Sequence, residues 1–68
     1  MSSIGEKIKS EYIDRIFEID LSLINTLQLI ADAISFDPNN YETAPILGKA
    51  YLKAWELLEV IGEVERKL

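Results

Sequence analysis

Three glutamates are the first candidates for chemistry in this sequence. Glu56, Glu59 and Glu63 are three and four residues apart, which would put their carboxylates on one face of a helix. Helical bundles that bind two metal ions combine such glutamates with Glu-x-x-His pairs, and this chain has no His. It also has no Cys, which removes thiolate ligands and disulfides. We therefore predict a solvated acidic face, with no metal and no cofactor.

Catalytic and nucleic-acid motifs are equally sparse. The sequence has no Cys nucleophile, no His base, no Gly-rich phosphate loop, and no Ser or Lys in a catalytic motif. The net charge of −5 disfavours general binding to nucleic acids or anionic membranes. Lys49 and Lys53, one helical turn apart, could contact RNA or an acidic partner, or could be ordinary surface charge. We predict a protein without enzymatic activity for which nucleic acid is an unlikely partner.

Size and composition indicate a single folded domain over residues 1–68. A chain this short without disulfides or metals depends on very good packing or on oligomerisation. The most apolar window, residues 21–31, is shorter than the ~20 residues that span a bilayer and contains polar side chains. No signal peptide is apparent. The sequence predicts a soluble cytoplasmic protein, and its ten Ile, single Gln and many Glu and Lys favour a hyperthermophilic source.

The apolar spacing predicts two long helices. Ser3 and Glu6 form a capping-box pattern for a first helix over about residues 3–35. Residues 36–42 contain Pro38 and two Asn residues, which predicts a hinge. A second helix is expected over about residues 43–67, with Thr43 as its N-cap and Pro45 in its first turn. The short connection makes the two helices antiparallel neighbours.

The apolar stripe of the first helix is wider than one partner helix can cover. We therefore predict an all-α antiparallel two-helix hairpin that dimerises into a four-helix bundle, with a homodimer as the commonest closed assembly. The residues expected in the core and dimer interface share this stripe or the heptad seam of the second helix: Ile13, Ile16, Phe17, Asp20, Leu23, Ile24, Leu27, Ile30, Leu47, Tyr51, Ala54, Leu58 and Ile61.

Two features interrupt this pattern. Asp20 falls within the apolar stripe, where a charge is costly unless it is paired or solvated. It is either a device that fixes helix register, which we favour, or part of a binding site. Leu52 and Trp55 point away from the seam, with Gly48 and Gly62 on the same flank. This flank is either the second interface of the bundle, which we favour, or an exposed docking patch that would include Lys49, Leu52, Lys53 and Trp55.

One short stretch resembles a known family. Leu47-Gly48-Lys49-Ala50-Tyr51, which leads into a long amphipathic helix, resembles the corresponding stretch of the small helical-hairpin protein of the fuselloviruses, the spindle-shaped viruses of hyperthermophilic archaea. Chain length, acidic character and helix layout agree. The resemblance implies a homodimeric antiparallel four-helix bundle of the plasmid copy-control type and a role as an adaptor between proteins, without catalytic residues. It also implies that Gly48 permits close helix approach and that Tyr51 fills the seam near the hinge.

The predicted function is accordingly that of an adaptor from a virus or mobile element. It would act through protein contacts of a dimeric bundle, and its partner would be an unidentified viral or host protein in the host cytoplasm. The alternative is an RNA-binding regulator with the copy-control type of bundle. A third possibility is an antitoxin-like subunit whose acidic helices neutralise a basic partner.

Overall fold

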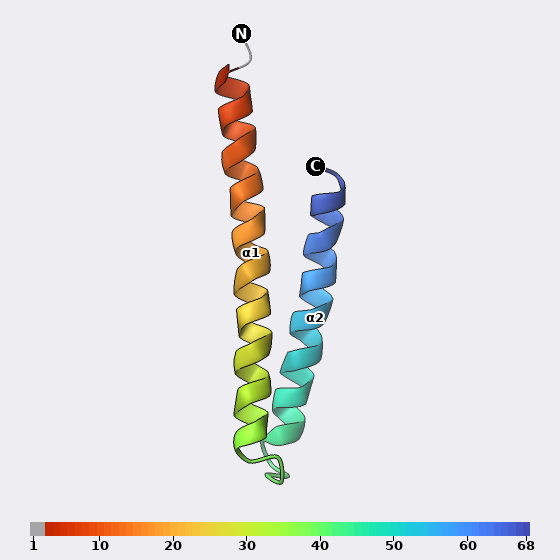
Figure 1. The fold of residues 1–68 in the computed structure, drawn as a ribbon. Helices are drawn as coiled ribbons and strands as arrows, with labels where there is room; N and C mark the ends of the chain where they lie inside the picture. Colours follow the sequence, from red (N-terminus) through yellow and green to blue (C-terminus); the bar gives the residue numbers. More distant parts are fainter. Residues whose placement is uncertain (1–2) are drawn as a thin grey trace.

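The chain forms a helical hairpin in a computed structural model, which describes the backbone of residues 3–68 and the side chains of residues 8–68. Helix α1 spans Ser3–Phe36 and helix α2 spans Ala44–Arg66. Residues 3–68 contain no strand, so the predicted all-α hairpin is confirmed. The molecule is a rod with extents of 60 × 18 × 12 Å (Figure 1).

Helix α1 is long because nothing interrupts its apolar periodicity before Pro38. Proline disfavours helical geometry in the residue before it, and the helix ends at Phe36, one residue beyond the predicted end. It begins at Ser3, but the side chains of the predicted capping box, Ser3 and Glu6, lie outside those that the structure describes.

The hinge is organised by Asn40. Its backbone N–H donates to the Asp37 carbonyl at 3.1 Å, and its own carbonyl accepts from the Ala44 N–H at 2.9 Å. Its side-chain Oδ1 accepts from the backbone N–H groups of Glu42 and Thr43, each at 3.1 Å. These are bonds of the Asx-turn kind, in which a side chain satisfies backbone donors at a chain reversal.

Thr43 occupies the predicted N-cap position of α2, but its side chain makes no capping hydrogen bond. Only its carbonyl takes part, by accepting from the Leu47 N–H at 2.9 Å. Pro45 lies in the first helical turn, where no partner for its missing N–H is needed. The predicted N-cap position is therefore confirmed, but the expected capping bond of the Thr43 hydroxyl is absent, and the Asn40 side chain instead satisfies backbone donors in the turn before the helix.

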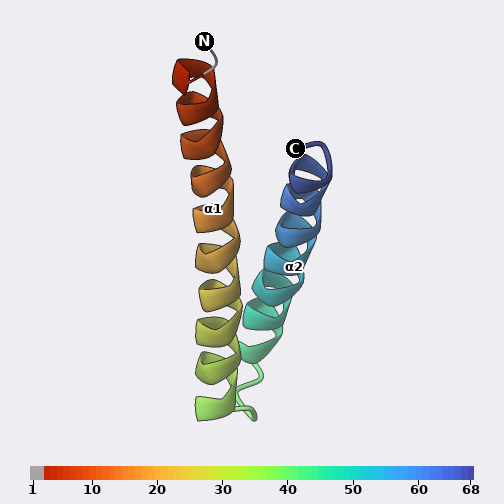
Figure 2. The same cartoon turned by 45° about the horizontal axis from the view of Figure 1, so that its top comes forward.

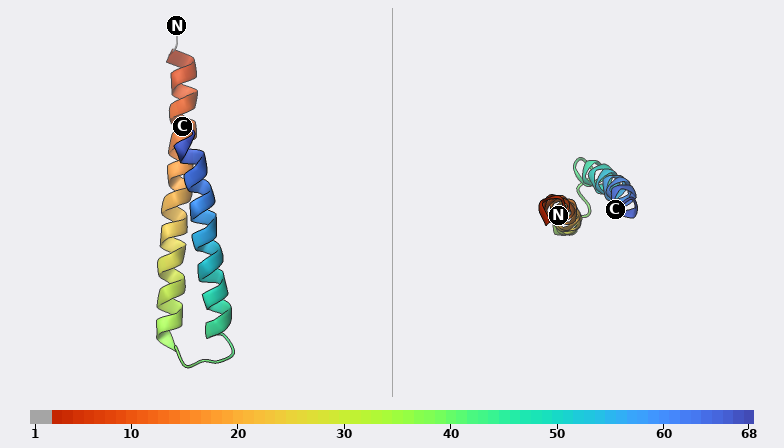
Figure 3. Two further views of the ribbon diagram at one scale, coloured as in Figure 1. Left: turned by 90° about the vertical axis from the view of Figure 1, so that its right-hand side faces the viewer. Right: turned by 90° about the horizontal axis from the view of Figure 1, so that it is seen from above.

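The two helices lie side by side in a single layer and cross at a shallow angle (Figures 2 and 3). The residues of α1 that are turned from solvent recur at steps of three and four, as in a heptad seam: Ile13, Ile16, Asp20, Leu23, Leu27, Ile30 and Ile34. The matching set on α2 is Ala44, Leu47, Tyr51, Ala54, Leu58, Ile61 and Glu65. We call the contact between these two sets the seam.

The register of the seam follows from one interhelical pair. Asp20 of α1 lies beside Glu65 of α2, close enough that its carboxyl group raises the pKa of Glu65. Because the helices are antiparallel, the residue seven positions after Asp20 on α1 lies opposite the residue seven positions before Glu65 on α2. Leu27 is therefore in the same layer as Leu58, one heptad nearer the hinge.

Candidate interaction surface

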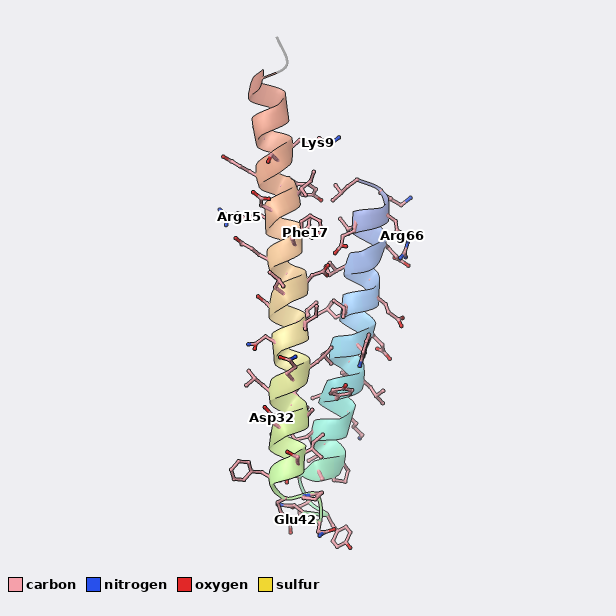
Figure 4. All side chains as sticks on the ribbon, viewed as in Figure 1. Lys9, Arg15, Phe17, Asp32, Glu42 and Arg66 are labelled. Atoms are coloured by element: carbon pink, nitrogen blue, oxygen red, sulfur yellow. The ribbon has the colours of Figure 1, made fainter. Side chains whose placement is uncertain are left out.

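The hairpin leaves part of α1 without a partner helix. At ~1.5 Å per residue, α1 with 34 residues is roughly 50 Å long and α2 with 23 residues is roughly 35 Å long. The N-terminal turns of α1 consequently extend beyond the end of α2 (Figures 1 and 3). The side chain of Lys9 projects on the α2 side in this overhang (Figure 4).

Apolar side chains continue from the seam onto both flanks of the hairpin. One flank, which we call the Trp55 flank, contains the residues that directly follow alternate seam positions: Phe17, Ile24, Gly48, Trp55 and Gly62. In antiparallel helix pairs these positions lie on the same side of the seam. The opposite Leu57 flank contains the residues that directly precede seam positions: Tyr12, Ile19, Ala33, Ala50, Leu57 and Val64.

The large side chains of both flanks are open to solvent. Phe17 and Trp55 on one flank are 50% and 45% exposed, and Leu57 on the other is 50% exposed, whereas Gly48, Gly62 and Val64 are half-buried. Among the described side chains, only Ile16 and Leu27 are buried, with 8% and 7% of their surface exposed. The sequence therefore supplies more apolar face than the hairpin covers.

The total solvent-accessible surface of the chain is also larger than expected for a compact protein of its mass. The chain exposes 5656 Å², whereas a compact monomer of 7.7 kDa exposes roughly 4300 Å² by the scaling of surface with mass. The excess is on the order of 1300 Å², which is more than the ~800 Å² that an interface of standard size removes from each partner. The chain therefore has enough surplus surface for an interface of at least standard size.

Gly48 has no role that the hairpin itself explains. A Cβ atom added at this position would meet nothing within 4 Å, and the backbone φ of the described glycines is not positive. Glycine within a helix costs roughly 1 kcal/mol relative to alanine. Small residues on a helix face allow a second helix to approach closely, so the open space at Gly48 marks the Trp55 flank as a place for such an approach.

The outer face of the rod combines polar side chains with exposed apolar ones such as Leu29 and Leu52. Glu11, Glu18, Asn25 and Asp32 on α1 and Lys49, Glu56 and Glu63 on α2 point away from the seam and are exposed. Arg15 Nη1 and Glu18 Oε2 form an exposed ion pair at 3.4 Å. This pair, with Glu11 and Asp14, lines an open depression of about 230 Å³. Over residues 8–68 no group of three acidic side chains is placed as metal ligands would be.

The acidic pair of the seam is the most unusual local feature. Asp20 from α1 and Glu65 from α2 are both half-buried, and Asp20 Oδ1 and Glu65 Oε1 are shielded from solvent with no hydrogen-bond partner. The pKa of Glu65 is raised above its ordinary value of 4.5, first because its protonated form hydrogen-bonds Asp20. Burial and the negative charge of Asp20 raise this pKa further, while Arg66 lowers it.

The predicted site residues fall into three groups in the structure. The seam brings together most of the expected core: Ile13, Ile16, Asp20, Leu23, Leu27, Ile30, Leu47, Tyr51, Ala54, Leu58 and Ile61. Phe17 and Ile24 lie on the exposed Trp55 flank, with Trp55 itself. The other proposed partner-binding residues, Lys49, Leu52 and Lys53, are exposed on the outer side of α2. Glu65 was not among the predicted residues.

Helix α1 also has the length and composition of a membrane-spanning helix between Ile8 and Phe36, and 6% of the apolar window in it is buried. The composition of the sequence had predicted no membrane-spanning segment. Seven charged residues lie between Ile8 and Phe36, Asp20 and Asp32 among them, and charged side chains in a bilayer are costly. A mostly buried core helix of a soluble protein and a signal sequence near the N-terminus pass the same criteria.

Comparison with known proteins gave no match to any protein family, characterised protein or solved structure. The interaction surface therefore has to be interpreted from its own geometry.

Proposed function

We propose that this chain is a non-enzymatic interaction protein that works as a homodimer, two hairpins forming a four-helix bundle. The observation that carries the proposal is the excess exposed surface, on the order of 1300 Å² beyond a compact monomer of this mass. A second copy covers it without any further sequence, and twofold dimers are the commonest oligomers. The absence of His and Cys from the sequence supports a function in binding rather than catalysis.

The Trp55 flank is the face that we assign to the dimer interface. It combines two large aromatic side chains, Phe17 and Trp55, with Gly48, whose surroundings are open. Aromatic residues are the usual anchors of interfaces, and glycine lets another helix come close. The Leu57 flank has no comparable open glycine.

The dimer then presents its remaining exposed surface to another protein. The outer side of α2, with Lys49, Leu52 and Lys53, combines apolar and basic side chains near the hinge. In line with the resemblance to the fusellovirus hairpin protein, we propose that the chain is a viral or mobile-element adaptor in the cytoplasm of a hyperthermophilic archaeal host. Its partner would be a viral or host protein.

Sedimentation equilibrium of the purified protein and of Trp55→Glu tests the dimer. The wild type should have twice the mass of the chain at micromolar concentration, and Trp55→Glu should shift the protein to monomer. Leu29→Glu is the matched control, because Leu29 is also on the surface, at 59% exposure, but lies outside both flanks. It should leave the mass unchanged. A wild-type monomer throughout the micromolar range would contradict the proposal. If that monomer floated with phospholipid vesicles, the exposed apolar surface would bind a bilayer instead of a second copy.

Gly48→Ala separates the dimer from the stability of the isolated hairpin. In a monomer the substitution should stabilise helix α2 by roughly 1 kcal/mol, because the added methyl group meets nothing. At a close helix contact it should instead weaken association. An increase in melting temperature that does not depend on protein concentration would remove Gly48 from the interface.

The alternative function is an RNA-binding regulator with the same bundle. Its support is the exposed pair Lys49 and Lys53, one turn apart on α2. An electrophoretic shift of structured RNA that weakens with salt and disappears in a Lys49→Ala, Lys53→Ala double variant would favour it. The net charge of −5 is the argument against it.

A further inference from the structure

The strongest unexplained feature of the hairpin is an apolar seam that ends in two acids. The layers nearer the hinge contain aliphatic or small residues and Tyr51 but no charged side chain, whereas the layer next to the end of α2 contains Asp20 and Glu65. The immediate neighbours of Asp20 along this face of α1 are apolar, including Ile16, Leu23 and Ile24. One oxygen of each carboxyl group, Asp20 Oδ1 and Glu65 Oε1, is shielded from solvent and has no hydrogen-bond partner.

The protonation state decides whether this layer holds together. When both groups are ionised they are acceptors only, and their shielded oxygens, Asp20 Oδ1 and Glu65 Oε1, have no donor. Like charges also repel across the helix contact. A single proton converts one carboxyl into a donor for the other, as in other carboxyl pairs that share a proton.

The remaining charges near the pair do not replace that proton. Among the described basic side chains, Arg66 is the one that lowers the pKa of Glu65, and it extends along the outer side of α2, away from α1 (Figure 4). Arg15 lies on the outer side of α1, where it pairs with Glu18.

We propose that Asp20 and Glu65 form a proton-operated latch at the open end of the hairpin. With one shared proton the last turns of α2 are held against α1, and with both carboxyls ionised these turns separate from it. The latch belongs to one chain and does not depend on the proposed dimer. It would let mild acidification extend the paired part of the hairpin.

The dependence of stability on pH has a definite sign. Because the folded-state pKa of Glu65 is raised, the folded protein binds more protons than the unfolded chain between 4.5 and that raised value. The stabilisation is complete below 4.5 and is lost as pH rises through the folded-state pKa. The melting temperature should therefore rise when pH falls from neutral toward 4.5, against the usual loss of stability with acid.

Two measurements on the full chain test the latch. The first follows the side-chain carboxyl carbon of Glu65 by NMR during a pH titration. Glu65 should titrate above 4.5 in the wild type and closer to its ordinary value in Asp20→Asn, whose amide donates to the Glu65 carboxylate. Titration of wild-type Glu65 at or below 4.5 would overturn the proposal.

The second measurement compares thermal unfolding of Glu65→Gln and Glu63→Gln across the same pH range. Both variants lose one negative charge from the same helix, but Glu63 is exposed and points away from the seam. Glu65→Gln should be more stable than the wild type at neutral pH and should lose most of the pH dependence, while Glu63→Gln should keep it. Equal slopes in the two variants would refute the latch, because they would show that overall charge controls stability.

Amide hydrogen exchange locates the effect. As pH falls, protection factors at residues 61–66 should rise, while those at residues 47–51 near the hinge should stay constant. Equal changes in both segments would contradict a local latch. Repeating the unfolding experiment at two protein concentrations distinguishes the two proposals, since a dimer makes the melting temperature depend on concentration and the latch does not.

Discussion

The seam and the flanks of this hairpin are built from the same kinds of residue and differ in what covers them. Leu27 in the seam is 7% exposed, whereas Leu57 on the Leu57 flank is 50% exposed. The flanks carry the larger aromatic side chains, Phe17 and Trp55, and keep about half of their surface in water. Periodicity decides which direction a side chain faces, whereas its burial also requires a second surface at the right distance.

Leu27→Ala should have the largest effect on the seam. Replacing a buried leucine by alanine costs about 2–5 kcal/mol, from lost transfer free energy and the cavity that remains. In a hairpin with so little buried surface this should lower the melting temperature by tens of degrees or prevent folding. Thermal unfolding followed by circular dichroism measures the change.

Leu29→Ala is the matched control for this substitution. It removes the same atoms from the same helix, but outside the seam and both flanks, and should change the free energy of unfolding by no more than about 0.5 kcal/mol. Similar losses in the free energy of unfolding of the two variants would show that the seam is no better packed than the outer surface.

The two helices were predictable from sequence because their signals are local. Steps of three and four along the apolar residues identified the helices, and Pro38 with its Asn neighbours identified the hinge. Asp20 also stood out, since a charge within an apolar stripe is visible without a structure. These features require only the spacing of residues along one helix.

The partner of Asp20 was missed because it depends on register between helices. Register is set by the length and geometry of the hinge, and spacing within α2 does not reveal it. A signal was nevertheless present: continuing the seam from Leu58 and Ile61 by four residues arrives at Glu65. The N-cap position of Thr43 was predicted correctly, but the spacing could not show that its hydroxyl makes no capping bond or that Asn40 satisfies the donors of the preceding turn, because both depend on the turn geometry.

Asn40→Ala should have a medium effect, through the hinge that aligns the two halves of the seam. It removes the acceptor of two backbone N–H groups at 3.1 Å and should cost about 1 kcal/mol, as loss of a helix cap does. Thr43→Ala is the control, since the Thr43 side chain makes no capping bond and its loss should matter less. Urea unfolding of both variants measures the two losses, and a larger loss for Thr43→Ala would show that the Thr43 side chain contributes more to the hinge than the Asn40 side chain.

Arg15→Ala should have the smallest effect, and it sharpens the difference between charges inside and outside the seam. Arg15 and Glu18 form an ion pair at 3.4 Å, but their side chains are 77% and 66% exposed. Water screens such a pair, and holding two long side chains in one arrangement costs entropy, so its contribution should be below about 0.5 kcal/mol. A double-mutant cycle with Glu18→Ala measures the coupling directly. Because the acidic pair of Asp20 and Glu65 is shielded from water, the coupling energy between these two residues should be larger in magnitude than that between Arg15 and Glu18. The reverse order would mean that burial in the seam does not strengthen electrostatic interactions.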